Sequence, residues 1–132
     1  MKGFDTPVLL EILEGRPSAT KLLKRLTGEE LCTTEANLFE LEAIARQERG
    51  AVLERRLAAV ERIRRGLTVL PLDEKAVRAA LARWRENGQG LTAGAWMVFG
   101  ALEANGCSEW FTSRSSAFPK VPTKVRVTRC VP

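Results

Sequence analysis

Residues 4–15, FDTPVLLEILEG, decide the fold class of this chain. The apolar start of the chain predicts a short strand over residues 1–5, although Gly3 weakens that strand. Thr6-Pro7 then opens a helix directly after the strand, because proline is favoured at the first helical position. The apolar residues of that helix lie on one face, and Gly15 ends it. A strand that leads directly into a helix is the first unit of an alternating pattern.

The same alternation continues to the other end of the chain. Further strands are expected over 30–33, 67–70, 110–112 and 125–127, and helices over about 17–28, 35–45, 51–65, 74–86 and 93–104. Short strands that alternate with helices predict an α/β fold, with a central, mostly parallel sheet flanked by helices in three layers. The length of 132 residues predicts a single domain over residues 1–132.

Composition excludes several kinds of chemistry. The chain has 45% apolar residues, enough for a core, and no histidine, which excludes Ser-His-Asp and Cys-His catalysis and histidine metal sites. Its 21 basic and 16 acidic residues give a net charge of +5. No acidic residue follows Glu109, whereas five basic residues do: Arg114, Lys120, Lys124, Arg126 and Arg129. This end of the chain is either an RNA-binding edge or a merely soluble tail.

The cysteines and the hydropathy pattern indicate in which cellular compartment the protein is expected. The three cysteines, Cys32, Cys107 and Cys130, are widely spaced and form no CxxC pair, which argues against a zinc ribbon or a thioredoxin-like site. Cys32 and Cys107 are expected to be small buried apolar residues. No apolar stretch approaches the length of a membrane span, and the first residues do not resemble a signal peptide. We therefore expect a cytoplasmic protein with no membrane partner.

Polar residues cluster where the predicted strands end. In parallel α/β sheets, ligands bind beyond the carboxyl ends of the strands, at the point where the strand order reverses. The residues that follow the predicted strands are therefore the candidate site residues: Asp5, Thr6, Thr33, Thr34, Pro71, Thr112 and Ser113.

Four segments, taken in order, resemble the PIN domain family. They are FDTPVLLEILEG from residue 4, LCTTEANLFELEAIA from residue 31, LTVLPLDEKAVRAA from residue 67 and ALEANGCSEWFTSRSSAFPKV from residue 101. Each segment alone is a weak signal, but their ordered set spans nearly the whole chain. Within the family, the chain is most similar to the compact VapC-type toxins of prokaryotic toxin–antitoxin pairs.

The resemblance implies a Mg²⁺- or Mn²⁺-dependent endoribonuclease that acts on RNA, forms a homodimer and is silenced by an antitoxin protein. The first two acids of the family site correspond to Asp5 and Glu40. These two carboxylates would act in catalysis and hold one weakly bound cation, because Mg²⁺ is often bound by one or two carboxylates together with waters and substrate phosphate. Auxiliary contacts are expected from Thr112, Ser113 and Ser115, whereas Arg114 could instead enter the cleft and neutralise the carboxylates.

Two further acids that the resemblance implies are absent. The third falls on Gly94 and the fourth on Ala117, and no shift of register restores either one. The glycine at position 94 either marks the loss of a functional acidic residue or allows two elements to pack closely. The sequence therefore supports two hypotheses: a ribonuclease toxin with a reduced acid set, or a catalytically degenerate PIN domain that binds RNA or protein.

Simpler interpretations exist for the same residues. Asp5 could act only as the N-cap of the helix after it. Glu40 lies among Leu38, Phe39 and Leu41, which favours a position at an apolar face, and an exposed glutamate is the alternative. The arginine-rich helix before residue 66 carries interspersed glutamates, which indicates a solvated, internally paired face. The large aromatic residues are expected in the core or in dimer contacts, namely Trp84, Trp96, Phe99 and Trp110.

Overall fold

A computed structural model describes residues 1–87, 91–113, 118, 119, 121 and 123–130. Helices and strands alternate in the order β1 (Lys2–Phe4), α1 (Thr6–Leu13), α2 (Pro17–Arg25), β2 (Leu31–Thr34), α3 (Glu35–Ala45), α4 (Gly50–Gly66), β3 (Thr68–Leu70), α5 (Glu74–Asn87), α6 (Ala93–Ala104), β4 (Glu109–Thr112) and β5 (Arg126–Arg129). The expected elements are all present, and their ends differ from the expected bounds by at most three residues.

The strands form one parallel sheet in the order β3-β2-β1-β4-β5. From β1 the chain first builds outward through β2 and β3, and then returns to place β4 on the other side of β1. The strand order therefore reverses between β1 and β4. This arrangement confirms the expected α/β class, and the parallel character of the sheet is complete among these five strands.

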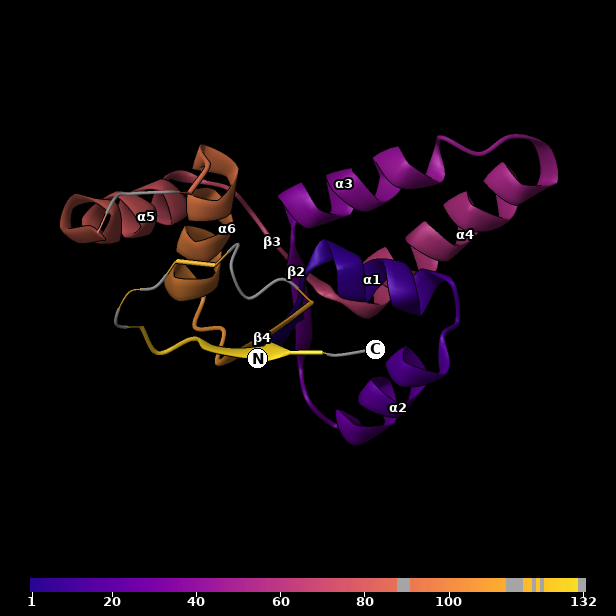
Figure 1. Cartoon of the computed structure of the whole chain (residues 1–132), viewed down its shortest axis with the longest axis horizontal. Coiled ribbons are helices and arrows are strands. Elements are labelled where there is room, and N and C mark those ends of the chain that lie inside the picture. The colour runs from indigo at the N-terminus through magenta and orange to yellow at the C-terminus, as the bar shows by residue number, and fades with distance from the viewer. Residues whose placement is uncertain (88–90, 114–117, 120, 122, 131–132) are drawn as a thin grey trace.

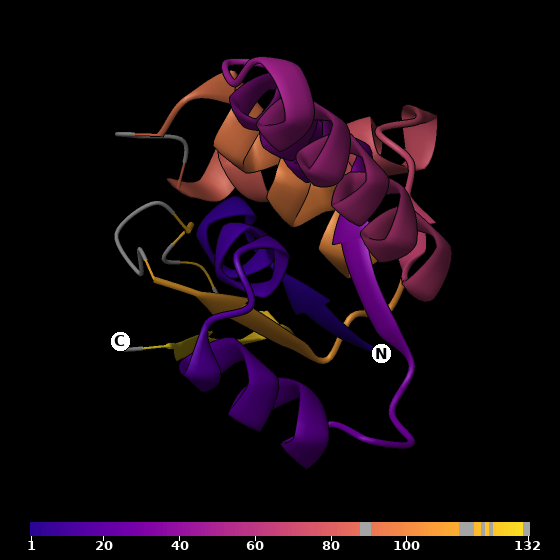
Figure 2. The same cartoon turned by 90° about the vertical axis from the view of Figure 1, so that its right-hand side faces the viewer.

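Helices cover both faces of the sheet (Figure 1), and an apolar core lies on each face. Side chains of successive strand residues point to opposite faces, so Trp110 packs in the core beneath α5 and α6 while Phe111 packs with Phe4 beneath α1. The second core also receives residues from α2, α3 and α4. Figure 2 shows α1 lying between α2 on one side and the α3–α4 pair on the other. The three layers expected from the sequence are thus present.

The helix ends follow the local sequence signals. Thr34 caps α3 by accepting a hydrogen bond from the backbone N–H of Asn37 (3.3 Å), and Thr92 caps α6 through the N–H of Ala95 (3.2 Å). Pro7 lies in the first turn of α1, where its missing N–H costs nothing. No helix in the described part of the chain is long and apolar enough to cross a lipid bilayer.

The aromatic residues divide into core and surface. Trp96, Phe99 and Trp110 are buried, as expected, whereas the Trp84 side chain on α5 is 49% exposed. Cys32 and Cys107 are both buried, which confirms that prediction.

Helices α5 and α6 touch at their backbones because α6 carries a glycine at the contact. A Cβ atom on Gly100 would lie 2.0 Å from the carbonyl oxygen of Ala76 on α5. Gly94, in the first turn of the same helix, has open space around it, with only the Thr92 hydroxyl oxygen at 3.9 Å. The two glycines of α6 therefore have opposite packing environments, and close packing does not account for Gly94.

Gly100→Ala should lower the free energy of unfolding by about 3 kcal/mol or more, because α5 must move away from α6. Its matched control, Gly94→Ala, should raise that free energy by about 0.5–1 kcal/mol, because alanine is the better helix former. Urea unfolding followed by circular dichroism measures both changes. Equal effects of the two substitutions would contradict this packing.

Candidate functional site

Asp5 lies at the point where the strand order reverses. It follows β1 directly, and Thr112 is the last residue of the neighbouring strand β4. The backbone N–H of Asp5 donates to the carbonyl oxygen of Phe111 (2.9 Å), which continues the ladder by one residue. The Thr112 hydroxyl donates to Asp5 Oδ2 (2.7 Å). The two strand ends are therefore joined by a side-chain hydrogen bond at the place where α/β sheets bind ligands.

The other carboxylate oxygen of Asp5 is held from the opposite side. Asp5 Oδ1 accepts hydrogen bonds from the backbone N–H of Thr6 (2.8 Å) and from Asn37 Nδ2 (3.0 Å). The bond from Thr6 makes Asp5 the N-cap of α1. Asp5 therefore acts as a helix N-cap, and the same carboxylate stands where the strand order reverses.

Asn37 is a site residue that the sequence analysis missed. It is 2% exposed, and its Nδ2 donates to the Thr6 hydroxyl oxygen (3.0 Å) as well as to Asp5. Its Oδ1 accepts a hydrogen bond from the Thr34 hydroxyl. An asparagine three residues after a capping threonine and three before Glu40 lies on the same helix face as Glu40. That spacing was the available signal.

A cleft of about 460 Å³ opens above Asp5 between α1, α3 and α6. The polar residues that line the cleft are Asp5, Thr6, Asn37, Glu40, Thr92 and Thr112. Gly94 and apolar residues form the rest of the lining. Asp5 and Glu40, predicted together from the sequence, line the same cleft. Ser113 follows Thr112 but is not among the residues that line it, while Arg114, Ser115 and Ala117 lie outside the described residues.

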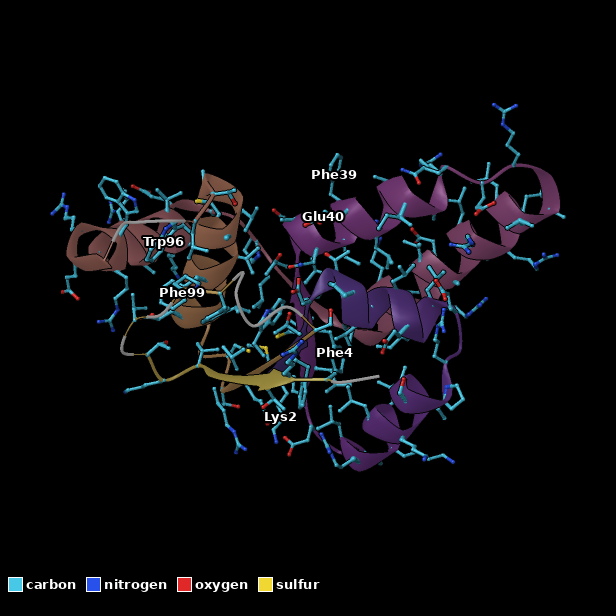
Figure 3. The ribbon with its side chains drawn as sticks, viewed as in Figure 1. Lys2, Phe4, Phe39, Glu40, Trp96 and Phe99 are labelled. Carbon is cyan, nitrogen blue, oxygen red and sulfur yellow. The ribbon has the colours of Figure 1, made fainter. Side chains whose placement is uncertain are left out.

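Glu40 is exposed, which corrects the expectation of a glutamate at an apolar face. Leu38 and Leu41 take the core-facing positions of α3, so the two residues between them point outward. Figure 3 shows Phe39 projecting away from the molecule, with Glu40 near the end of α3 that faces α6. Glu40 therefore lines the cleft at its open rim.

Three other glutamates, close in sequence to residues that line the cleft, form ion pairs with basic residues. Glu42 forms ion pairs with Arg46 (3.3 Å) and Arg64 (3.5 Å), and Glu103 binds Arg83 (2.9 Å). Glu109 begins β4 at the amino end of the sheet, where it lies 3.5 Å from Lys2. Desolvation raises the pKa of Glu109, but its hydrogen bond from Thr128 and the charge of Lys2 outweigh this, and the net pKa is lowered. None of these three glutamates is among the residues that line the cleft.

The residues that line the cleft include two carboxylates, which could serve as ligands of a hard cation. No three acidic, cysteine or histidine side chains converge on one point among the described residues. The first turn of α6 contains Gly94 and no acid, so α6 supplies no carboxylate to the cleft. Two carboxylates with the Thr112 hydroxyl nearby match the way in which Mg²⁺ binds few protein ligands and keeps several waters.

Comparison with known proteins identifies the family to which this fold belongs. A family model described as the PIN domain matches residues 4–108. The chain belongs to the PIN domain family. A search of curated protein sequences finds no match.

This PIN domain is similar in fold to VapC-type toxins of solved structure. It superimposes on a chain of the DNA-bound VapBC2 complex of Rickettsia felis with a TM-score of 0.79 at 11% identity, covering 97% of each chain. For DNA-bound VapBC of Salmonella typhimurium the TM-score is 0.76 at 22% identity, covering 98% of each. For VapC20 of Mycobacterium tuberculosis, described as a toxin that cleaves the sarcin-ricin loop, it is 0.61 at 14% identity, covering 92% of this chain and 100% of that one.

Asn37→Ala should lower the free energy of unfolding by about 1–3 kcal/mol, because it leaves buried hydrogen-bonding groups of Thr6 and Thr34 without their partner. Chemical denaturation measures the change. The control Gln47→Ala, at an exposed position after α3, should change the free energy by less than about 0.5 kcal/mol. An Asn37→Ala variant as stable as the wild type would contradict the network described above.

Proposed function

We propose that this PIN domain is an endoribonuclease toxin of the VapC kind that uses a single Mg²⁺ or Mn²⁺ ion held by Asp5 and Glu40. The observation that carries the proposal is that both carboxylates line one cleft at the reversal point of the sheet. The similarity in fold to a toxin described as cleaving the sarcin-ricin loop supports RNA as the substrate.

Asp5, Glu40, Thr112 and Asn37 each have a defined role in this proposal. Thr112 and Asn37 fix the direction of the Asp5 carboxylate, so the ligand is oriented before any substrate arrives. Glu40 lines the cleft at its rim, where it would serve as the second carboxylate ligand of a bound ion. A bound divalent cation would polarise the phosphodiester and lower the pKa of a bound water. The chain has no histidine, so none can serve as a general base.

A second candidate function is favoured by Gly94. Gly94 lines the same cleft as Asp5 and Glu40, and a side chain there would meet open space. The three uncharged donors around Asp5 also satisfy its oxygens without a cation. These observations support a degenerate domain that binds RNA or a protein without cleavage.

The purified protein should cleave RNA when Mn²⁺ or Mg²⁺ is added, and EDTA should abolish the cleavage. Asp5→Asn should lower the rate by more than the roughly 10–100-fold that loss of an outer ligand partner costs. Glu42→Gln, a change on the same helix as Glu40 but outside the cleft, is the matched control and should keep the wild-type rate. Gel analysis of structured and single-stranded RNAs measures all of these samples.

Gly94→Asp separates the two candidate functions. If the wild type is inactive at high enzyme concentration and Gly94→Asp gains metal-dependent cleavage, the degenerate function is correct. Cleavage that persists in EDTA or in Asp5→Asn would contradict the ribonuclease proposal.

An antitoxin protein is the proposed regulatory partner, supported by the toxin–antitoxin complexes to which the chain is similar in fold. The surface that suits such a partner is a groove along α4. One part is an apolar hollow of about 300 Å³ whose wall includes Leu13, Leu23 and Ile63, and it adjoins a basic hollow that includes Arg55 and Arg62. A segment with apolar residues followed by acidic residues would complement both parts.

A homodimer is proposed from the exposed apolar face of α5. Val77, Leu81 and Trp84 lie one and two helical turns apart and are 36%, 48% and 49% exposed. Exposed apolar patches of this kind mark protein–protein contacts. We infer that a second copy of the chain covers this face.

The double variant Leu81→Glu with Trp84→Glu should be a monomer with native circular dichroism, because charged groups cannot be buried against a second copy without a partner. Sedimentation velocity compares its mass with that of the wild type. Ala82→Glu, exposed on another face of α5, is the control and should remain a dimer. A monomeric wild type would contradict the proposal.

A further inference from the structure

Two buried thiols meet across the central strand of the sheet. Cys32 lies in β2, Cys107 precedes β4, and β1 runs between these two strands. The Cys32 thiol donates a hydrogen bond to Cys107 Sγ, with the sulfur atoms 3.9 Å apart. As a thiol, Cys107 in turn donates to the carbonyl oxygen of Glu109 (3.2 Å). The two sulfur atoms are therefore already directed at each other.

Gly3 provides the space in which the sulfur atoms approach. In the parallel register, Gly3 of β1 is paired with Cys32 on one side and with Trp110 on the other. A Cβ atom on Gly3 would lie 2.9 Å from Cys32 Sγ and 2.6 Å from the Trp110 ring. The glycine that weakens β1 as a strand is thus required by the side chains of its two neighbours.

We propose that Cys32 and Cys107 are a peroxide-sensitive pair that forms an intramolecular disulfide across β1. A disulfide needs the sulfur atoms to approach by about 1.9 Å from their present separation. Side-chain rotation and small strand shifts supply this movement, since no side chain of Gly3 intervenes. The inference goes beyond the proposed nuclease and does not depend on it.

The reaction balances with hydrogen peroxide as the oxidant. The Cys107 thiolate attacks one peroxide oxygen, the O–O bond breaks, and a sulfenic acid forms with release of hydroxide, which takes up a proton to become water. Cys32 sulfur then attacks Cys107 Sγ, the S–O bond breaks, and the second oxygen leaves as water. The two thiols lose two electrons and two protons in total, and the peroxide becomes two waters.

The electrostatics of the pair assign these roles. The hydrogen bond from Cys32 is the main cause that lowers the pKa of Cys107, while the same bond and burial raise the pKa of Cys32. Cys107 is therefore the thiol that ionises first and attacks the oxidant. Peroxide is close to water in size, so local opening of the structure around the pair admits it where larger disulfide oxidants are excluded.

The third cysteine is an internal control. Cys130 packs with the other core, on the opposite face of the sheet, and burial raises its pKa. It therefore stands apart from the Cys32–Cys107 pair and lacks the activation of Cys107.

The test uses the full chain carrying Cys130→Ser, so that only the proposed pair remains. After treatment with hydrogen peroxide, titration should show the loss of both thiols, and peptide mapping should find Cys32 linked to Cys107. The midpoint of thermal unfolding should rise by roughly 5–15 °C, because the bond closes a long loop, and should return to its original value with dithiothreitol. In the variant Cys32→Ser with Cys130→Ser, in which the serine hydroxyl can still donate to Cys107 Sγ, dimedone should label Cys107 as a sulfenic acid.

Several results would overturn the proposal. Two intact thiols after peroxide treatment would do so, as would linkage between chains. In the natural sequence, oxidation confined to Cys130 would also contradict it. The mapping in the Cys130→Ser background needs no substitution at Cys32 or Cys107, so a folding defect in the dimedone variant leaves the mapping result intact.

Discussion

The carboxylate of Asp5 is the constraint on which the site depends. It stands one residue beyond β1, where the order of strands reverses, and takes hydrogen bonds from three different elements: β4 through Thr112, α1 through the Thr6 N–H, and α3 through Asn37. One charged group thereby ties the start of α1 to the end of β4 and to a buried residue of α3. The cleft owes its floor to this set of bonds, and Glu40 owes its position to the same helix that carries Asn37.

Side chains of successive strand residues alternate between the two faces of the sheet beneath the site. Trp110 and Phe111 follow each other in β4 and fill opposite cores, one with α5 and α6 and the other with α1 to α4. Among the glycines that the structure describes, Gly3 and Gly100 are the two positions where neighbouring groups come too close for any side chain. Gly94 has no such packing role, because its surroundings are open. Gly94 lines the cleft at the position where the family resemblance implies a third acidic residue.

Local signals made much of this fold predictable. Pro7, Thr34 and Thr92 mark helix starts in the sequence, and each stands at a helix start in the structure. Asp5 and Glu40 were brought together by resemblance, and they line one cleft. Asn37 was missed because its spacing from Thr34 and Glu40 is a weak signal alone, and its role depends on contacts with residues over 30 positions away. The exposure of Glu40 was likewise set by packing between helices and strands, which the apolar periodicity along one helix does not encode.

The number of cations that the cleft binds tests the central claim most directly. Electron paramagnetic resonance of Mn²⁺ titrated into the purified protein counts the bound ions, and it requires no knowledge of the RNA target. The account predicts one bound Mn²⁺ per chain in the wild type and none in Asp5→Asn, with Glu42→Gln unchanged. Two bound ions in the wild type, or binding that survives in Asp5→Asn, would contradict it.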